Sequence, residues 1–245
     1  MSERRRPDPH YERLPAREYF GVLNKDPNEY RDPTALWENV SETIEELRRG
    51  VDREEVPLAE LRPLLIGVYG ALRIYTLRQF IDPNRAILEK YPGYCPYCHY
   101  DECHCPEVRR GLVERREPMP PRPILPQNEL IRPEQAQRLL ERVYGRTNEP
   151  RTVSELSESF FKEATEVEEW IEHWAAAGNA FTPEDAQAFT YELADLFARL
   201  YAVMTRLGID IGNELAGAGG PPYGGTRRPK IAIASIYTPI PQLDE

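Results

Sequence analysis

The sequence lacks the features that place a protein in a membrane or on nucleic acid. No apolar run approaches the roughly 20 residues that cross a bilayer, and no apolar segment follows the basic start at residues 1–7. We therefore expect no secretory signal and a cytoplasmic protein. The net charge is −10, from 41 acidic against 31 basic residues. This excess argues against nucleic acid or an anionic membrane as the main partner, because both require clustered Lys and Arg.

Several common catalytic motifs are also missing. The chain has no phosphate-binding Gly-x-x-x-x-Gly-Lys-Ser/Thr, no Gly-x-Ser-x-Gly and no dinucleotide-binding glycine fingerprint. A glycine-rich stretch at residues 217–225 neither follows a strand nor opens a helix, so we interpret it as flexible tail. His10 and His173 are isolated, which favours surface or packing roles.

Proline is plentiful, with 24 residues, but Pro183 is the one proline between Arg151 and Gly220. Proline breaks helix interiors, so this region can hold long helices. Apolar residues at spacings of three and four predict helices over residues 34–50, 58–80, 133–146, 153–177 and 183–207, and a short one after Pro83. Thr34 and Thr182 are the expected N-caps, and Gly50 and Gly208 the expected ends. We predict that residues 231–237 form a short strand or an extended arm.

A weak internal repeat suggests that a two-helix unit is duplicated. Residues 60–82 align without a gap over residues 188–210, with matched Leu, Arg and Ile-Asp positions. We therefore predict an all-α helical bundle of two fused units with irregular arms. The predicted segments are an N-terminal arm (1–33), a first unit (34–91), a cysteine knuckle (92–106), a Pro/Arg-rich linker (107–133), a second unit (134–215) and a Gly/Pro-rich tail (216–245).

Two acid pairs lie on the two strongest helices. Glu163 and Glu166 are three residues apart on the first helix, and Glu192 and Asp195 are three apart on the second. Residues at this spacing share one helix face, so antiparallel packing would bring four carboxylates together. Crowded carboxylates repel unless some are protonated or a hard cation such as Mg²⁺ binds them. Solvated helix faces are the alternative, since such pairs are common on surfaces.

The motif Glu-x-x-Glu, 25 residues, then Glu-x-x-Asp resembles the signature of the MazG-like all-α nucleoside triphosphate pyrophosphohydrolases. The stretch from Tyr191 to the Leu-Gly-Ile-Asp end at Asp210 is similar to that family's second core helix. The resemblance covers residues 154–215. It implies Mg²⁺ held by Glu163, Glu166, Glu192 and Asp195, with Glu169 as a further acid. It also implies hydrolysis of an NTP or dNTP to the monophosphate and pyrophosphate, with water attacking the α-phosphorus.

We interpret the first unit as a degenerate copy of the second. Glu42 and Glu45 resemble the first acid pair, but Leu64 and Gly67 stand where the repeat aligns Glu192 and Asp195. We therefore expect a structural role for the first unit, which completes the bundle as a pseudo-dimer. The arms and the knuckle leave room for a homodimer or for a protein partner.

Substrate-binding residues are less well defined. Lys162, Arg199 and Arg206 lie on the acid-bearing helices, and Arg227, Arg228 and Lys230 lie in the tail. An intrahelical ion pair with Asp195 would explain Arg199 equally well. Trp170 and Tyr201 are candidates to stack on the base, although aromatic residues at this spacing more often belong to the core.

All four cysteines fall within eleven residues, as Cys95-x₂-Cys98-x₄-Cys103-x-Cys105. This spacing favours a closed, structural zinc site. His99 or His104 could replace a sulfur, and a redox dithiol or no ligand are the alternatives. The leading interpretation is thus a Mg²⁺-dependent pyrophosphohydrolase with structural Zn²⁺. The rival is a non-catalytic zinc-containing adaptor of the same fold.

Overall fold

The computed structural model describes residues 33–53, 56–79, 81–117, 132–176 and 182–217, and these residues form helices and connecting loops without a strand. The all-α prediction is confirmed for this part of the chain. The helices are α2 (Pro33–Val51), α3 (Leu58–Arg78), α4 (Pro83–Lys90), α5 (Cys105–Arg109), α6 (Pro133–Asn148), α7 (Val153–Ala176), α8 (Pro183–Arg206) and α9 (Ile211–Gly217). No described helix is both long enough and apolar enough to cross a membrane.

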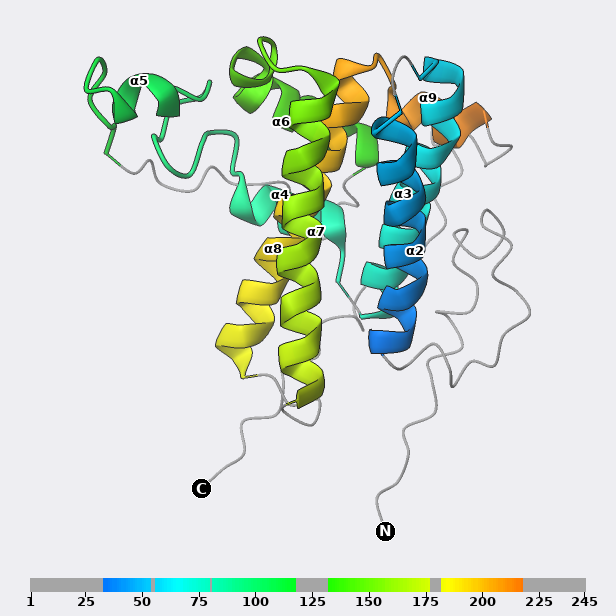
Figure 1. The fold of residues 1–245 in the computed structure, drawn as a ribbon. Helices are drawn as coiled ribbons and strands as arrows, with labels where there is room; N and C mark the ends of the chain where they lie inside the picture. The colour runs from blue at the N-terminus through cyan, green and yellow to red at the C-terminus, as the bar shows by residue number, and fades with distance from the viewer. Residues whose placement is uncertain (1–32, 54–55, 80, 118–131, 177–181, 218–245) are drawn as a thin grey trace, which may run out of the picture.

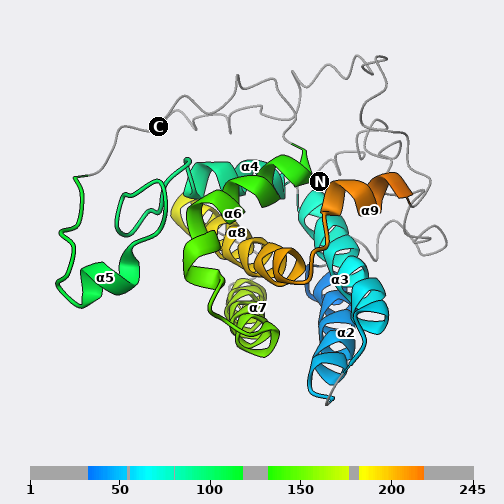
Figure 2. The same cartoon turned by 90° about the horizontal axis from the view of Figure 1, so that it is seen from above.

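Four helices form the bundle that carries the site. The hairpin α2–α3 lies beside the hairpin α7–α8, with α2 packed on α7 and α3 packed on α8 (Figure 1). Viewed from above, α4 and α6 lie on the side of α8 that faces away from α7, and α9 lies near α3 (Figure 2). One continuous apolar core joins both hairpins, from Trp37 and Tyr75 to Phe160 and Phe197.

Local sequence explains where several helices begin and end. Thr182 caps α8 in a reciprocal box with Asp185, each accepting a hydrogen bond from the other's backbone N–H at 3.1 Å. The predicted N-cap is therefore confirmed. The helix stops at Gly208, whose φ of 70° is the left-handed conformation that glycine adopts without strain. In α2 the predicted limits are wrong by one residue, because the helix begins at Pro33 and continues through Gly50 to Val51.

Gly50 has a packing role instead. A Cβ there would lie 2.9 Å from Leu64 Cδ1, so a larger residue would displace the end of the Leu64 side chain on α3. Two short helices, α5 and α9, are absent from the sequence-based prediction. The predicted arm, most of the linker and the tail, with His10, Arg227, Arg228, Lys230 and the strand at 231–237, lie outside the described residues.

The segments aligned by the internal repeat occupy matching positions. Each contributes the second helix of a hairpin, and each ends in an Ile-Asp pair that precedes a short helix. The Asp82 carboxylate accepts hydrogen bonds from the Asn84 and Arg85 N–H groups and so caps α4. The Asp210 carboxylate accepts from the Asn213 N–H at 3.0 Å at the start of α9. Helix capping therefore gives the repeated aspartates a shared structural reason.

Candidate functional site

The α7–α8 interface brings three of the four predicted acids together. Carboxylate oxygens of Glu163, Glu166 and Glu192 all lie within 4.8 Å of one another. Glu163 is buried, while the other two are partly exposed. Glu163 and Glu166 come from α7 and Glu192 from α8, so this proximity depends on packing between the helices. Oxygen donors so grouped could hold a hard cation such as Mg²⁺.

The environment separates the pKa values of these acids. Burial raises the pKa of Glu163, and the negative charge of Asp195 adds to the rise. Burial also raises the pKa of Glu192, again with a contribution from Asp195. A hydrogen bond from Lys162 lowers the pKa of Glu166, which therefore stays ionised. The group thus holds more negative charge than its setting readily accommodates.

Asp195 lies next to this group but faces another helix. Lys90 Nζ lies 2.6 Å from Asp195 Oδ2, and the Tyr91 hydroxyl donates a short hydrogen bond to Oδ1. Lys90 also donates to the Tyr191 carbonyl oxygen at 3.1 Å. Both partners of Asp195 come from the end of α4, within the predicted first unit. That unit therefore contributes side chains to the site as well as packing.

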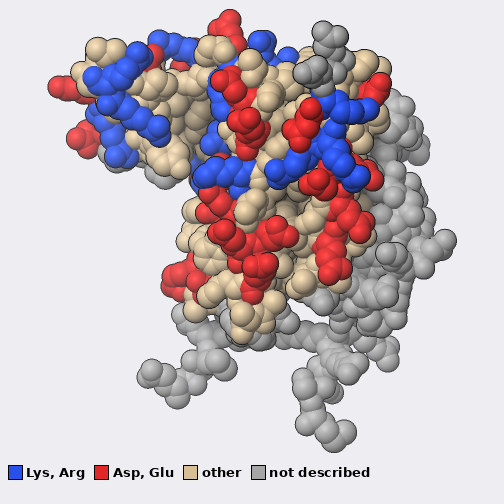
Figure 3. All heavy atoms as spheres, in the orientation of Figure 1, with Lys and Arg blue, Asp and Glu red and all other residues tan. Residues whose placement is uncertain are grey.

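Each neighbouring cation is paired with a different acid. Lys162 lies 2.5 Å from Glu166 along α7, and Arg199 Nε lies 3.1 Å from Glu163 across the helix interface. The alternative pairing of Arg199 with Asp195 is not what forms, because Lys90 and Tyr91 occupy the Asp195 oxygens. On one face of the molecule, acidic side chains gather below a band of Lys and Arg (Figure 3).

The remaining predicted residues lie apart from this group. Glu169 is exposed on α7 and is not a member of the three-acid group. Trp170 packs against the core, and Tyr201 is 1% exposed between Tyr69 and Phe197. Tyr201 is thus a core residue, and no base can stack on its face in this conformation. The Arg206 guanidinium donates to the Arg151 carbonyl oxygen at 3.1 Å.

A pocket between α6 and α8 does not contain the acids. It has a volume of about 330 Å³ and lies between α6 and α8, where Gln137, Tyr144, Thr205 and Arg206 are part of its wall. None of the four acids lines it. A second pocket of about 250 Å³ between α2 and α7 includes Arg48 and Lys162. Neither pocket is lined by a group of carboxylates within 4.8 Å of one another, so the acidic group is the better candidate for metal chemistry.

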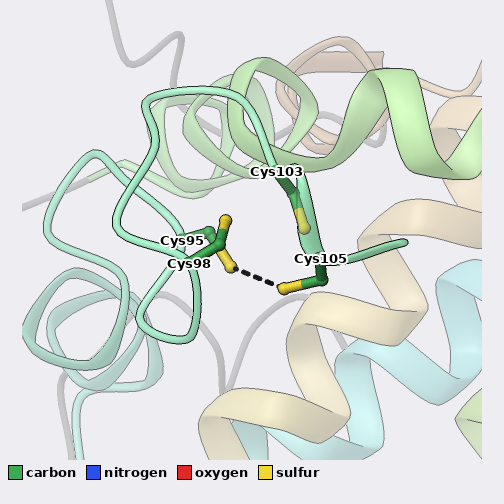
Figure 4. A group of neighbouring side chains, drawn as sticks. All are labelled: Cys95, Cys98, Cys103 and Cys105. Atoms are coloured by element: carbon green, nitrogen blue, oxygen red, sulfur yellow. Dashed lines mark hydrogen bonds between the residues drawn. The ribbon is translucent and has the colours of Figure 1, made fainter. Parts of the chain in front are cut away.

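The four cysteines form a second cluster beside α6. Their sulfur atoms all lie within 4.8 Å of one another, and Cys95, Cys98 and Cys103 are buried (Figure 4). The Cys95 and Cys105 sulfurs are 3.6 Å apart, so they are not bonded as a disulfide. Backbone groups support the loop: His104 N–H donates to Cys98 Sγ at 3.3 Å, and Cys103 N–H donates to the Val143 carbonyl oxygen at 2.7 Å. Four such thiols could bind a metal such as zinc.

The two histidines of this loop have other partners. His99 Nδ1 lies 2.7 Å from the Arg116 carbonyl oxygen, and the His104 ring faces the Arg146 guanidinium at 2.9 Å. Neither belongs to the cysteine group. Interaction with Cys103 lowers the pKa of Cys95, and the same interaction raises the pKa of Cys103. Close packing therefore couples the ionisation of these two thiols, and a bound cation would replace their protons.

Lys90 and Tyr91 are the site residues that the sequence did not identify. They lie 104 or more positions from Asp195, and no periodic pattern connects them to it. The only available signal was their place just before the Pro-Gly turn that leads into the cysteines. Comparisons of the chain with models of known protein families, with curated proteins and with solved structures find no match.

Proposed function

We propose that this chain is a Mg²⁺-dependent nucleoside triphosphate pyrophosphohydrolase of MazG-like type. In the reaction, water attacks the α-phosphorus, the bond to the bridging oxygen breaks, and the monophosphate and pyrophosphate leave. The observation that carries the proposal is the convergence of Glu163, Glu166 and Glu192 within 4.8 Å, with Asp195 alongside. These are the four acids on which the family resemblance rests.

The residues fit a hard divalent cation by charge and by donor type. Every donor is a carboxylate oxygen, which Mg²⁺ prefers. Raised pKa values at Glu163 and Glu192 indicate charge that a cation would relieve. Mg²⁺ bound there would supply charge neutralisation for phosphoryl oxygens and Lewis acidity toward water.

The chain's own cations have a second role in this proposal. Lys162, Arg199 and Lys90 each pair with one acid of the site. When the carboxylates turn to a cation, these ammonium and guanidinium groups lose their partners beside the bound triphosphate. Arg199 presents a planar fork suited to phosphate oxygens, while Lys90 and Lys162 act as point charges. They would hold the triphosphate and stabilise the leaving pyrophosphate.

We further propose that the cysteine cluster holds a structural Zn²⁺. Four sulfur donors suit zinc and leave no open position for a substrate. The cluster would then fasten the loop after α4 to α6.

Product analysis with the zinc-loaded protein tests the proposed activity. The protein is incubated with Mg²⁺ and each NTP and dNTP in turn, and the monophosphate and pyrophosphate are quantified. Glu163→Gln and Asp195→Asn should each lower the rate by about 100-fold or more, as expected for loss of a metal-binding carboxylate. Glu172→Gln, an exposed acid further along α7, should leave the rate unchanged.

One observation favours a non-catalytic adaptor as a second candidate. Tyr97 and Leu112, around the cysteine loop, are 63% and 67% exposed. Large exposed side chains of this kind are typical of protein contacts. If no nucleotide is hydrolysed, and neither acid variant alters Mg²⁺ binding, the enzyme proposal is wrong and the adaptor remains.

A further inference from the structure

The end of α4 connects the cysteine cluster to the acidic site. Lys90 is the last residue of α4, and Tyr91 follows it as the C-cap. Tyr91 is only 6% exposed, yet its hydroxyl reaches Asp195 on α8. Burial raises the pKa of Tyr91 well above its ordinary value, and the Asp195 charge raises it further, so the hydroxyl keeps its proton and remains a donor.

Tyr91 is in turn held from the cysteine side. Its ring meets the ring of Tyr144 edge-on, with centroids 5.6 Å apart and planes at 89°. The Tyr144 hydroxyl, on α6, donates to Cys95 Sγ at 3.8 Å. Cys95 also follows Tyr91 by only four residues, across a turn in which Gly93 has a φ of 87°. The tyrosine is thus fixed to the cysteine cluster both along the chain and through space.

We propose that the cysteine cluster, acting through Tyr144 and Tyr91, orients the Asp195 carboxylate at the acidic site. Tyr91 and Tyr144 are positioning residues, since Tyr91 acts through Asp195 and Tyr144 acts through Tyr91. Tyr91 occupies Oδ1 and leaves Oδ2 to exchange between Lys90 and a cation. The expected effect of Tyr91 on cation binding rests on the proposed function. The orientation of Asp195 by Tyr91 does not.

A metal at the cysteines gives this contact chain its rigidity. Four thiolates bound to one ion have fixed separations, whereas four thiols are joined only by weak sulfur contacts. Losing the metal would loosen Cys95, then Tyr144, and then the edge contact on Tyr91. Carboxylates that bind a metal depend on such outer hydrogen bonds for their orientation.

The first test compares tyrosine variants of the zinc-loaded protein. Tyr91→Phe removes the hydrogen bond to Asp195, and Tyr144→Phe removes the contact with Cys95 while keeping its ring. Tyr100→Phe is the matched control, because its hydroxyl donates to the Glu114 carbonyl oxygen at 3.1 Å on the same loop. Mn²⁺, which replaces Mg²⁺ at carboxylate sites, is titrated and the free ion is measured by electron paramagnetic resonance. Zinc content is measured in each sample.

We expect Tyr91→Phe to weaken Mn²⁺ binding by about 10-fold, the usual effect of losing an outer partner. Tyr144→Phe should weaken it by a smaller factor, and Tyr100→Phe should leave it unchanged. Zinc content should stay at one per chain in all samples. Unchanged Mn²⁺ affinity in both Tyr91→Phe and Tyr144→Phe would overturn the proposal.

A second readout keeps the proposal testable if no cation binds. The ¹³C resonance of the Asp195 carboxylate, assigned with Asp195→Asn, is compared before and after zinc removal. It should shift on removal in the wild type and should be less sensitive in Tyr144→Phe. If zinc removal unfolds the chain, the Asp195 resonance is compared between the zinc-loaded wild type and the zinc-loaded Tyr91→Phe and Tyr144→Phe proteins. A resonance that is the same in all three would refute the coupling. Absence of Mn²⁺ binding with a zinc-dependent Asp195 resonance would refute the proposed function alone, whereas an insensitive resonance would refute the coupling.

Discussion

Removing one carboxylate from the acidic group should stabilise the protein when no cation is bound. Glu192 is the best choice, because among the described residues it makes no ion pair of its own. Its carboxylate lies within 4.8 Å of those of Glu163 and Glu166. At that distance each neighbour repels it by about 1 kcal/mol in bulk water and about 3.5 kcal/mol at an effective dielectric constant of 20. The side chain is partly exposed and Lys90 attracts it, so we expect Glu192→Gln to raise the free energy of unfolding by about 1–2 kcal/mol.

Urea unfolding at pH 7 and low salt measures this difference. Mg²⁺ is removed by gel filtration rather than by a chelator, since a chelator would also strip the cysteines. The advantage of Glu192→Gln should shrink in 1 M salt, where the screening length is about 3 Å. Added Mg²⁺ should reverse the order: at a hundred times Kd it stabilises a protein that binds it by about 2.7 kcal/mol. Glu172→Gln serves as the control and should track the wild type.

The pH dependence gives the same prediction a second check. The pKa of Glu192 is raised in the folded protein above its ordinary value of 4.5. Its contribution to stability is therefore present at low pH and is lost as the pH rises through the raised pKa. The gap between Glu192→Gln and wild type should open as the pH rises above about 4.5. A variant that is less stable than wild type at pH 7 without Mg²⁺, or a gap that closes with rising pH, would refute this account of the site.

Three further predictions concern the fold and the cysteines. Gln137 Nε2 donates to the Ile209 carbonyl oxygen at 2.7 Å and its Oε1 accepts from Ile211 N–H at 3.0 Å, so Gln137→Ala should lower the unfolding free energy by about 2–4 kcal/mol in urea titrations. Thr182→Ala should lower the free energy of unfolding by about 1 kcal/mol through loss of the α8 cap. Thr190→Ala is the control, since the Thr190 hydroxyl donates back to the Ala186 carbonyl oxygen within the helix. Apparent zinc affinity, measured by chelator competition, should fall more than about tenfold per pH unit below neutrality, because thiols must lose protons to bind; a pH-independent affinity would exclude a thiolate site.

Most of the helical framework was predictable because its signals are local. The apolar spacing and the capping residues around Thr182 and Gly208 act within one helix, so sequence distance does not obscure them. Helices α5 and α9 are not predicted because each is at most seven residues long, too short for a periodic apolar pattern. The sequence predicts a helix end at Gly50 because glycine often stops helices, but here Gly50 lies inside α2 and is buried against α3.

The site was predictable where one helix pair defines it, and not where a third helix enters. The three-residue spacing predicts that Glu163 and Glu166 share one helix face. Antiparallel packing of the two helices then predicts that this face meets Glu192. A spacing of four residues offers an ion pair with Asp195 as an alternative role for Arg199, but Arg199 pairs with Glu163 across the helix interface. Asp195 is occupied by Lys90 and Tyr91, which reach it only through the packing of α4 on α8. Long-range contacts of this kind leave no periodic trace in a single sequence.

The two hairpins differ in chemistry, and the contact between α4 and α8 joins them at the acidic site. In the first hairpin Glu42 is exposed and Glu45 pairs with Arg48 on the surface, while Leu64 and Gly67 take the positions that the repeat gives to Glu192 and Asp195. That hairpin therefore packs without the cost of crowding carboxylates. The second hairpin bears that cost, and the net charge of −10 matches the eleven acids and single base of residues 155–195. Lys90 lies 2.6 Å from one of those acids and is supplied by the first half, so the acidic site depends on both halves even though its acids come from one.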